Sequence, residues 1–250
     1  LLYRTAKKLK EKGRDDIADD KKRQEEELLH IIPRERRKSY EMREIIDLVF
    51  DKTTFFEITK FYGRGIITGF ARINGYSVGI LANDSNFYGG SMSAQGAQKT
   101  SRFVKLCDTF HLPIVSLVDE PGFLIGPEAE MEATILHGAE AVLAVTETSV
   151  PWSTVMIRKS FGVAAAAHFG PDGYVLAWPS AESGPLPLEG GVAVAFKKEI
   201  EASENPEAKR KEIEEKMSKQ QNPFPRAVSF SVHEIIDPRE TRQYLCEWSE

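Results

Sequence analysis

The stretch GIITGFARINGYSVGILAND, residues 65–84, constrains the fold more than any other part of the sequence. Two runs rich in β-branched and aromatic residues flank the dipeptide Asn74-Gly75. Both turn residues tolerate a positive φ, which a two-residue type I′ turn requires. The sequence therefore predicts an antiparallel β-hairpin.

After this hairpin, helical and strand-like patterns alternate along the chain. Residues 93–111 and 129–148 have helical patterns, whereas 112–119 and 150–157 are short apolar runs typical of buried strands. Alternation of this kind predicts an α/β fold around a central, largely parallel sheet. Ligands of such sheets bind in loops at the carboxyl ends of the strands.

The apolar residues of three segments define the helix faces that we expect to be buried. Each set recurs at the three- and four-residue spacing of an amphipathic helix. The predicted faces are Met42, Ile45, Ile46 and Val49; then Phe103, Leu106, Cys107 and Phe110; and finally Ile135, Leu136, Ala139, Val142 and Leu143.

Charged segments lie at both ends of the chain. Residues 1–38 have little apolar periodicity, and we interpret them as a charged linker or loosely held helix before an ordered domain of residues 39–250. Residues 192–221 have the pattern of two charged helices interrupted at Asn205-Pro206. Near the end, Asp237, Pro238 and Glu240 form a capping box that opens a last helix.

Composition excludes several classes of function. The net charge of −5 gives no support to nucleic-acid binding or to binding of an anionic membrane. No apolar run reaches the roughly 18 residues that a membrane span requires. The two cysteines, Cys107 and Cys246, are far apart and predict neither a disulfide framework nor a metal site, so a reducing compartment is expected.

Two predicted strands run into glycine-containing loops, EPGFLIG (120–126) and RKSFGVAAAA (158–167). Each loop then opens a helix, whose first N–H groups lack an internal partner. Two such donors, held in place, stabilise an oxygen that gains negative charge. We therefore predict a site whose reagents are backbone amides. A Gly/Ala-rich helix start more often reflects tight packing on a sheet, and Pro121-Gly122 alone fits a plain turn equally well.

Side chains offer fewer candidates for chemistry. His137 and His168 lack a partner at metal-ligand spacing, and we interpret both as structural; His111 lies at a helix end. Asp119 and Glu120 follow a strand and form a possible acid/base pair, although helix capping is the favoured role. No metal site is predicted.

Several motifs in one order resemble the carboxyltransferase subunit of biotin-dependent acyl-CoA carboxylases, such as those that act on acetyl- or propionyl-CoA. These motifs are VDEPGFLIG, ILHGAEAV, VPWSTVMIRKSFG and LAWPSAE, together with GFARINGYSVGILAN and EIIDPRETR. They cover residues 31–245. The resemblance implies a crotonase-like spiral of β-β-α turns with additional C-terminal helices, similar to the carboxyl-terminal of two such domains.

The resemblance also implies a function and a site. Such enzymes move a carboxylate from carboxybiotin, held on a separate carrier, to the α-carbon of an acyl-CoA. The expected catalytic amides are those of Gly126, Gly162, Val163 and Ala164, which stabilise charge on the ureido oxygen of biotin. Biotin and substrate contacts are expected from the rest of both loops, namely Gly122, Phe123, Leu124, Ile125, Phe161, Ala165 and Ala166.

Two positions depart from the pattern of this family. Val163 stands where many relatives have glycine, which adds bulk but keeps the amide. Ala166 stands where relatives that prefer short acyl groups often carry Asp or an aliphatic residue, which leaves the acyl length open.

The expected partners are an amino-terminal carboxyltransferase domain, a biotin carboxyl carrier, a biotin carboxylase, and further copies in an assembly of up to a hexamer. The expected compartment is the cytoplasm or the mitochondrial matrix. Three alternatives stay open: a docking domain without catalysis, a decarboxylase or transcarboxylase subunit, and a hydratase or isomerase that uses Asp119 or Glu120.

Overall fold

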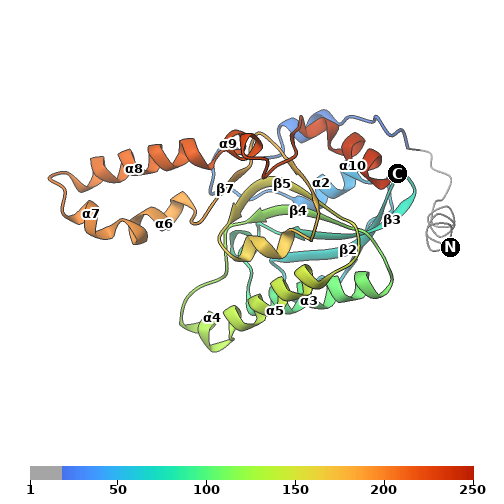
Figure 1. Cartoon of the computed structure of the whole chain (residues 1–250), viewed down its shortest axis with the longest axis horizontal. Helices are drawn as coiled ribbons and strands as arrows, with labels where there is room; N and C mark the ends of the chain where they lie inside the picture. Colours follow the sequence, from blue (N-terminus) through green and yellow to red (C-terminus); the bar gives the residue numbers. More distant parts are fainter. Residues whose placement is uncertain (1–18) are drawn as a thin grey trace.

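The computed structural model describes residues 19–250, which form one sheet with helices on both of its faces (Figure 1). The strand order is β1-β2-β3-β4-β5-β6-β8, and β7 pairs with the far part of β5. The strands are β1 (Phe56–Ile58), β2 (Ile66–Ile73), β3 (Tyr76–Asn83), β4 (Ile114–Glu120), β5 (Trp152–Phe161), β6 (Tyr174–Ala177), β7 (Glu182–Gly184) and β8 (Glu234–Ile235). The β1–β2 and β2–β3 pairs are antiparallel, and the remaining pairs are parallel.

The predicted hairpin is confirmed. Ile73 pairs with Tyr76 across a two-residue turn. Asn74 and Gly75 have φ values of 51° and 76°, as a type I′ turn requires. The Gly75 amide also donates to Asp51 Oδ2 at 2.8 Å, which attaches the turn to the body of the protein.

Two apolar cores lie on opposite faces of the sheet (Figure 1). Helices α2 (Met42–Val49) and α10 (Thr241–Ser249) cover one face, and α3 (Ala94–Thr109) and α5 (Thr134–Glu147) cover the other. The strands serve both cores because successive side chains point to opposite sides. In β4, Val115 and Leu117 pack toward α2, whereas Ile114 packs toward α3.

The predicted face of the first amphipathic helix is confirmed and that of the next is only partly right. Met42, Ile45, Ile46 and Val49 of α2 are all buried. In α3, Phe103 and Cys107 are buried, but Phe110 lies beyond the helix end and is 66% exposed. The predicted face therefore extends one residue beyond the helix, and Leu106 on it is half-buried.

The predicted face of α5 is wrong except for Val142, which is half-buried against the core. Ile135, Leu136 and Leu143 are exposed, and Ala139 is exposed with them. The buried side consists mainly of small residues: Thr134, Gly138, Ala141, Ala144 and Val145. Small residues let a helix approach its neighbours closely, and a Cβ on Gly138 would lie 2.3 Å from the Phe123 ring.

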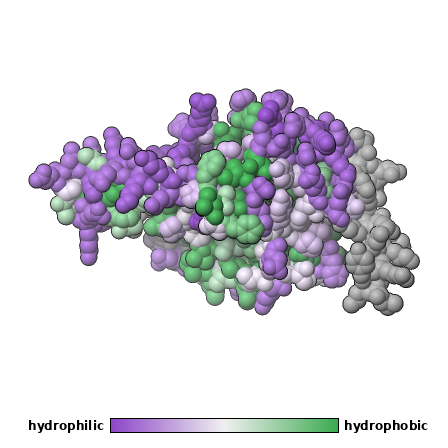
Figure 2. Space-filling model, turned by 45° about the horizontal axis from the view of Figure 1, so that its top comes forward, coloured by the Kyte–Doolittle hydropathy of each residue, from purple (hydrophilic) through white to green (hydrophobic). Residues whose placement is uncertain are grey.

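A helical extension projects from the body (Figure 1). It contains α6 (Leu188–Ala195), α7 (Lys197–Glu201) and α8 (Pro206–Gln221), followed by α9 (Pro223–Val228) at its base. The predicted break is confirmed, since the Asn205 side chain caps α8 by accepting from the Ala208 amide. The surface of this extension is mostly hydrophilic (Figure 2).

The ends of the chain differ from the simplest expectation. Residues 1–18 of the predicted charged linker lie outside the described residues. Within 19–38, a short 3₁₀ helix, η1 (Glu26–Leu29), buries Leu28, and Arg23 donates to the Phe50 carbonyl at 2.8 Å. Asp237 caps η4 (Pro238–Glu240) by accepting from the Arg239 amide, and α10 then begins at Thr241. No helix among residues 19–250 is both long and apolar enough to cross a bilayer.

Candidate active site

The two predicted loops leave neighbouring strands at the same edge of the sheet. Strands β4 and β5 are parallel, and Glu120 at the end of β4 pairs with Ser160 near the end of β5. One loop then leads into α4 (Pro127–Met131), and the other leads into the 3₁₀ helix η3 (Ala164–His168). The structure therefore brings both loops to the edge where ligands of such sheets bind.

The fold itself uses part of the first loop. The Gly122 amide donates to Glu120 Oε1 at 2.9 Å, and the Leu124 amide donates to the Met92 carbonyl at 2.9 Å. The Phe123 ring lies against Gly138 of α5 and has a packing role. The amides of Ile125 and Gly126 donate to no acceptor among residues 19–250. Gly126 has a φ of 121°, a left-handed conformation that favours glycine.

The second loop corrects one predicted donor. The Gly162 amide donates to the Gly184 carbonyl of β7 at 3.0 Å and is not free to meet a ligand. The Val163 and Ala164 amides have no acceptor within the described part of the chain. Val163 is 69% exposed, whereas Ala164 is fully buried. Of the predicted catalytic residues with unpaired amides, Val163 is exposed, Gly126 is half-buried and Ala164 is buried. Val163 and Gly126 are therefore the two candidates that the structure leaves accessible.

The helices that follow these loops are shorter than the sequence indicated. Both α4 and η3 contain five residues. A macrodipole needs several aligned turns. The site therefore depends on individual amides rather than on helix ends. Phe161 is fully buried, so its side chain has no access to a ligand, while Ala165 and Ala166 line a cavity.

The capping role predicted for the two carboxylates is wrong. Asp119 accepts from Arg158 Nη2 at 2.9 Å and from the Lys159 amide at 3.1 Å, on the side of β4 opposite Glu120. Both carboxylate side chains are fully buried. Neither side chain is exposed to solvent, so the structure gives no support to the hydratase or isomerase alternative, which needs one of them as an acid/base.

Glu120 and His168 form a second buried pair beneath the loops. Glu120 Oε2 lies 3.6 Å from His168 Nε2 and accepts from Asn83 Nδ2 at 3.0 Å. His168 Nδ1 is 2.9 Å from Ser116 Oγ, which confirms a structural role for this histidine. Burial raises the pKa of Glu120. His168, the Gly122 amide and the Asn83 side chain have the opposite, smaller effect on this pKa.

Cavities flank both loops. One of about 520 Å³ includes Leu124 and Ile125 of the first loop, beside Arg64 and Phe87. Another of about 300 Å³ includes Gly162, Ala165 and Ala166 of the second loop. The polar lining of this second cavity consists of Ser160, Ser183, Arg226 and Ser231. It could not be predicted from local patterns, because these residues come from segments far apart in the sequence.

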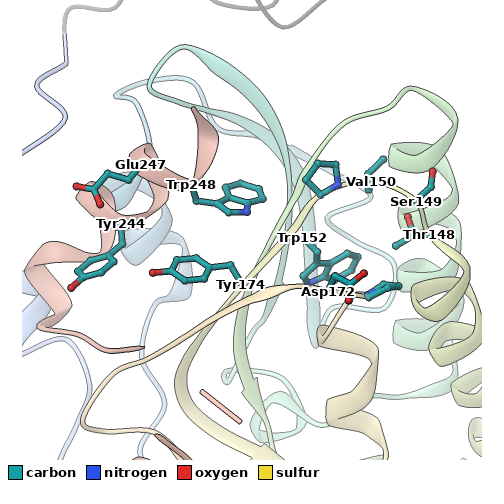
Figure 3. A pocket seen from close by; sticks show the side chains of 11 residues that line it. Thr148, Ser149, Val150, Trp152, Asp172, Tyr174, Tyr244, Glu247 and Trp248 are labelled. Atoms are coloured by element: carbon teal, nitrogen blue, oxygen red, sulfur yellow. The ribbon is translucent and has the colours of Figure 1, made fainter. Parts of the chain in front are cut away.

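A cavity of about 670 Å³ lies at the opposite edge of the sheet (Figure 3). It is lined by aromatic side chains at the start of β5 and β6 and on α10, namely Trp152, Tyr174, Tyr244 and Trp248. None of the predicted site residues contributes to it. This edge carries the amino ends of the strands, where ligands of parallel sheets are not expected.

The chain belongs to the carboxyl transferase domain family, whose model matches residues 4–250. The carboxyltransferase subunit of Haloferax mediterranei propionyl-CoA carboxylase is 36% identical over 98% of this chain. The methylmalonyl-CoA carboxyltransferase 12S subunit of Propionibacterium freudenreichii is 39% identical over 88% of it.

Solved structures agree with this assignment. The crystal structure of transcarboxylase 12S, with methylmalonyl-coenzyme A and methylmalonic acid bound, has a TM-score of 0.87, 36% sequence identity and 94% coverage of this chain. The β subunit of Pseudomonas aeruginosa geranyl-CoA carboxylase has a TM-score of 0.82 at 25% identity. The expected crotonase-like fold is thereby confirmed.

The chain spans about half the length of the curated relatives that it matches. It covers 48% of the Haloferax subunit and 43% of the 12S subunit. The same holds for the structure of transcarboxylase 12S, of which it covers 46%.

Proposed function

We propose that this chain supplies the biotin-side half of an active site that transfers a carboxylate between carboxybiotin and the α-carbon of an acyl-CoA. The observation that carries this proposal is the pair of unpaired amides, Gly126 and Val163, in loops that follow neighbouring parallel strands. Membership of the carboxyl transferase domain family supports the same reaction class.

The residues at this edge fit the ureido group of biotin. A ureido oxygen is a hydrogen-bond acceptor. The amides of Gly126 and Val163 are donors that the fold leaves unpaired within the described residues. The Val163 side chain points outward, since it is 69% exposed, so its bulk does not cover the loop. When bound, carboxybiotin supplies the carboxylate and an oxygen that gains negative charge as the carboxylate leaves. Amide donors aimed at such an oxygen stabilise that charge.

No side-chain nucleophile is required for this role. The protein's contribution is to hold the amides of Gly126 and Val163 in place. Phe123 packed on Gly138 fixes the first loop, and the bond from the Gly162 amide to β7 fixes the second. These contacts explain why the amides of Gly122, Leu124 and Gly162 are used by the fold, while their neighbours stay free.

We further propose that an amino-terminal carboxyltransferase domain covers the exposed side of α4 and α5 and completes the site. Apolar side chains concentrate there, beside the first loop: Ile125, Met131, Ile135, Leu136 and Leu143 are each at least 54% exposed. Figure 2 shows hydrophobic surface on the body of the molecule, whereas the extension is mostly hydrophilic. Contiguous exposed apolar patches mark protein interfaces.

Transcarboxylase 12S assembles as a hexamer, and that assembly supports an oligomeric state for this protein as well. Delivery of the carboxylate would then require a biotin carboxyl carrier and a biotin carboxylase. The same amides serve the reverse transfer, so a decarboxylase or transcarboxylase subunit fits the geometry equally well. The only observation that favours a docking domain without catalysis is the exposed apolar surface of α4 and α5 in the described part of the chain.

Val163→Pro tests the proposal, with Val163→Ala as the matched control. Val163 has a φ of −71°, which proline adopts, and its amide makes no bond that the fold would lose. In the complete carboxyltransferase that contains this chain, Val163→Pro is expected to lower kcat by about 10²–10³. Val163→Ala keeps the amide and should keep the rate. Equal rates for the two variants would support the docking domain instead.

A further inference from the structure

The cavity beside the second loop has an unusual polar lining. It lies between β5, β7, η3 and α9 and has a volume of about 300 Å³. Ser160 and Ser183 are direct neighbours across the β5–β7 pair, so their side chains lie on one side of the sheet. Arg226 of α9 lines the same cavity, as does Ser231, whose hydroxyl lies 3.1 Å from Ser229 Oγ.

Ser183 contributes a polar atom that the fold leaves unused. Its residue is only 6% exposed, and its Oγ has no hydrogen-bond partner among residues 19–250. Buried hydroxyls are normally paired, because an unmade hydrogen bond costs the free energy of desolvation. A hydroxyl that lines a cavity and has no partner indicates a ligand that supplies the missing bond.

Arg226 contributes a positive charge without a partner. Its guanidinium makes no ion pair or hydrogen bond with any side chain that the structure describes, and its backbone carbonyl accepts from Ser229 Oγ. No Asp or Glu whose side chain the structure describes lines the cavity. In a protein with a net charge of −5, a half-buried arginine with no acidic partner among the described side chains fits a counterion that a ligand supplies.

The remaining walls leave room for a hydrocarbon stem. Met156, Phe169 and Val232 are apolar, and Ala165 and Ala166 are small. The cavity also includes Gly162, which directly precedes the free amide of Val163. A ligand here would therefore extend toward the candidate active site.

We propose that this cavity binds a carboxylate group carried by a substrate of the transfer reaction. Guanidinium and hydroxyl groups together donate to the two oxygens of a carboxylate, which only accepts. The carboxylate has two possible sources, the far end of a dicarboxylic acyl-CoA and the carboxyl group of carboxybiotin. This inference rests on the proposed function, because that function brings both ligands to this edge.

Arg226→Gln separates the two sources in the complete enzyme. Arg210→Gln is the matched control, since Arg210 lies on α8 and pairs with Glu214. The substrates are glutaryl-CoA and valeryl-CoA, which have equal acyl lengths but differ in the distal carboxylate. If the acyl group is the source, Arg226→Gln raises KM for glutaryl-CoA by about tenfold to a hundredfold and leaves valeryl-CoA unaffected. If carboxybiotin is the source, kcat falls by a similar factor for both substrates at unchanged KM.

Unchanged constants for both substrates in Arg226→Gln would overturn the inference. Ser183→Ala gives a second test, with an expected change of about threefold to tenfold in the same constant as Arg226→Gln. If one of the two variants changed KM and the other changed kcat, Ser183 and Arg226 would not bind the same carboxylate.

Binding of free glutarate to the 250-residue chain tests the cavity without any transfer. Calorimetry is expected to detect glutarate binding by the wild type and by Arg210→Gln, and its loss in Arg226→Gln. If the complete enzyme carboxylates no acyl-CoA but this pattern holds, the proposed function fails and the carboxylate site stands. Equal or absent glutarate binding in all three proteins would contradict the site.

Discussion

Helices α2 and α5 both carry apolar residues at helical spacing, but only α2 buries them. In α2, Ile45 and Ile46 are fully buried against the sheet. In α5, Ile135 and Leu136 face outward, and Gly138 and Ala141 face the protein. The pattern of apolar residues therefore identifies the apolar side of a helix. It does not show whether the chain's own core or another domain covers that side.

This difference separates what the chain needs in order to fold from what it needs in order to work. Residues of α2 contribute to the stability of the chain itself. The outer residues of α5 contribute nothing to that core, and in the proposed assembly they contact another domain. Four changes test this comparison.

The largest expected effect is on the α2 side. Ile46→Ala should lower the free energy of unfolding by about 2–5 kcal/mol, because it leaves a cavity in a fully packed core. Ile135→Ala on the outer side of α5 should change it by no more than about 0.5 kcal/mol. Urea unfolding of the 250-residue chain measures both. Similar losses for the two variants would show that Ile135 is buried in the folded chain and would contradict the exposed outer side of α5.

The inner side of α5 should also be sensitive, at a single glycine. Gly138→Ala places a Cβ 2.3 Å from the Phe123 ring, so Phe123 and the loop behind it must move. Glycine to alanine normally stabilises a helix by about 1 kcal/mol. Here we expect a loss of about 1–3 kcal/mol, with a fall in transfer activity.

Ala139→Ser, on the exposed side one residue further, is the control and should have little effect on either quantity. A Gly138→Ala variant that is more stable than the wild type would mean that Phe123 does not fix the loop.

The outer side of α5 should affect assembly instead of folding. Leu136→Ser is expected to leave the unfolding of the chain nearly unchanged and to weaken its association in the complete enzyme by about tenfold. Val228→Ser replaces a residue that is 91% exposed on α9, away from this surface, and serves as the control. Analytical ultracentrifugation over a range of concentrations distinguishes the two. An identical assembly for both variants would exclude the α4–α5 surface as the interface.

The smallest effect concerns pH and the pair beneath the loops. Burial raises the pKa of Glu120 above its ordinary value of 4.5, so the folded protein holds this proton more tightly than the unfolded chain. The resulting contribution to stability is complete below pH 4.5 and is lost as the pH rises through the raised pKa. Glu120→Gln should remove that part of the pH dependence. Unfolding measured from pH 4 to pH 8 checks it, and identical slopes in both proteins would contradict the buried carboxylate.

Local patterns predicted the elements whose determinants are close in sequence. Asn74-Gly75 dictates its own turn, and α2 meets a single sheet face, so its periodicity was sufficient. The loops at 122–126 and 162–164 were identified from glycines and from a family resemblance. What could not be predicted depends on distant partners: β7 takes the Gly162 amide, and α9 brings Arg226 beside Ser183. The outward orientation of Ile135 and Leu136 on α5 could likewise not be predicted from the local sequence.

The most direct test of the backbone site is a crystal structure of the complete carboxyltransferase with biotin bound. We expect the ureido oxygen to accept from the Val163 amide at about 3 Å, while the Gly162 amide stays bonded to the Gly184 carbonyl. A ureido group bound instead in the aromatic cavity of Trp152 and Trp248, or one that contacts neither Val163 nor Gly126, would contradict it.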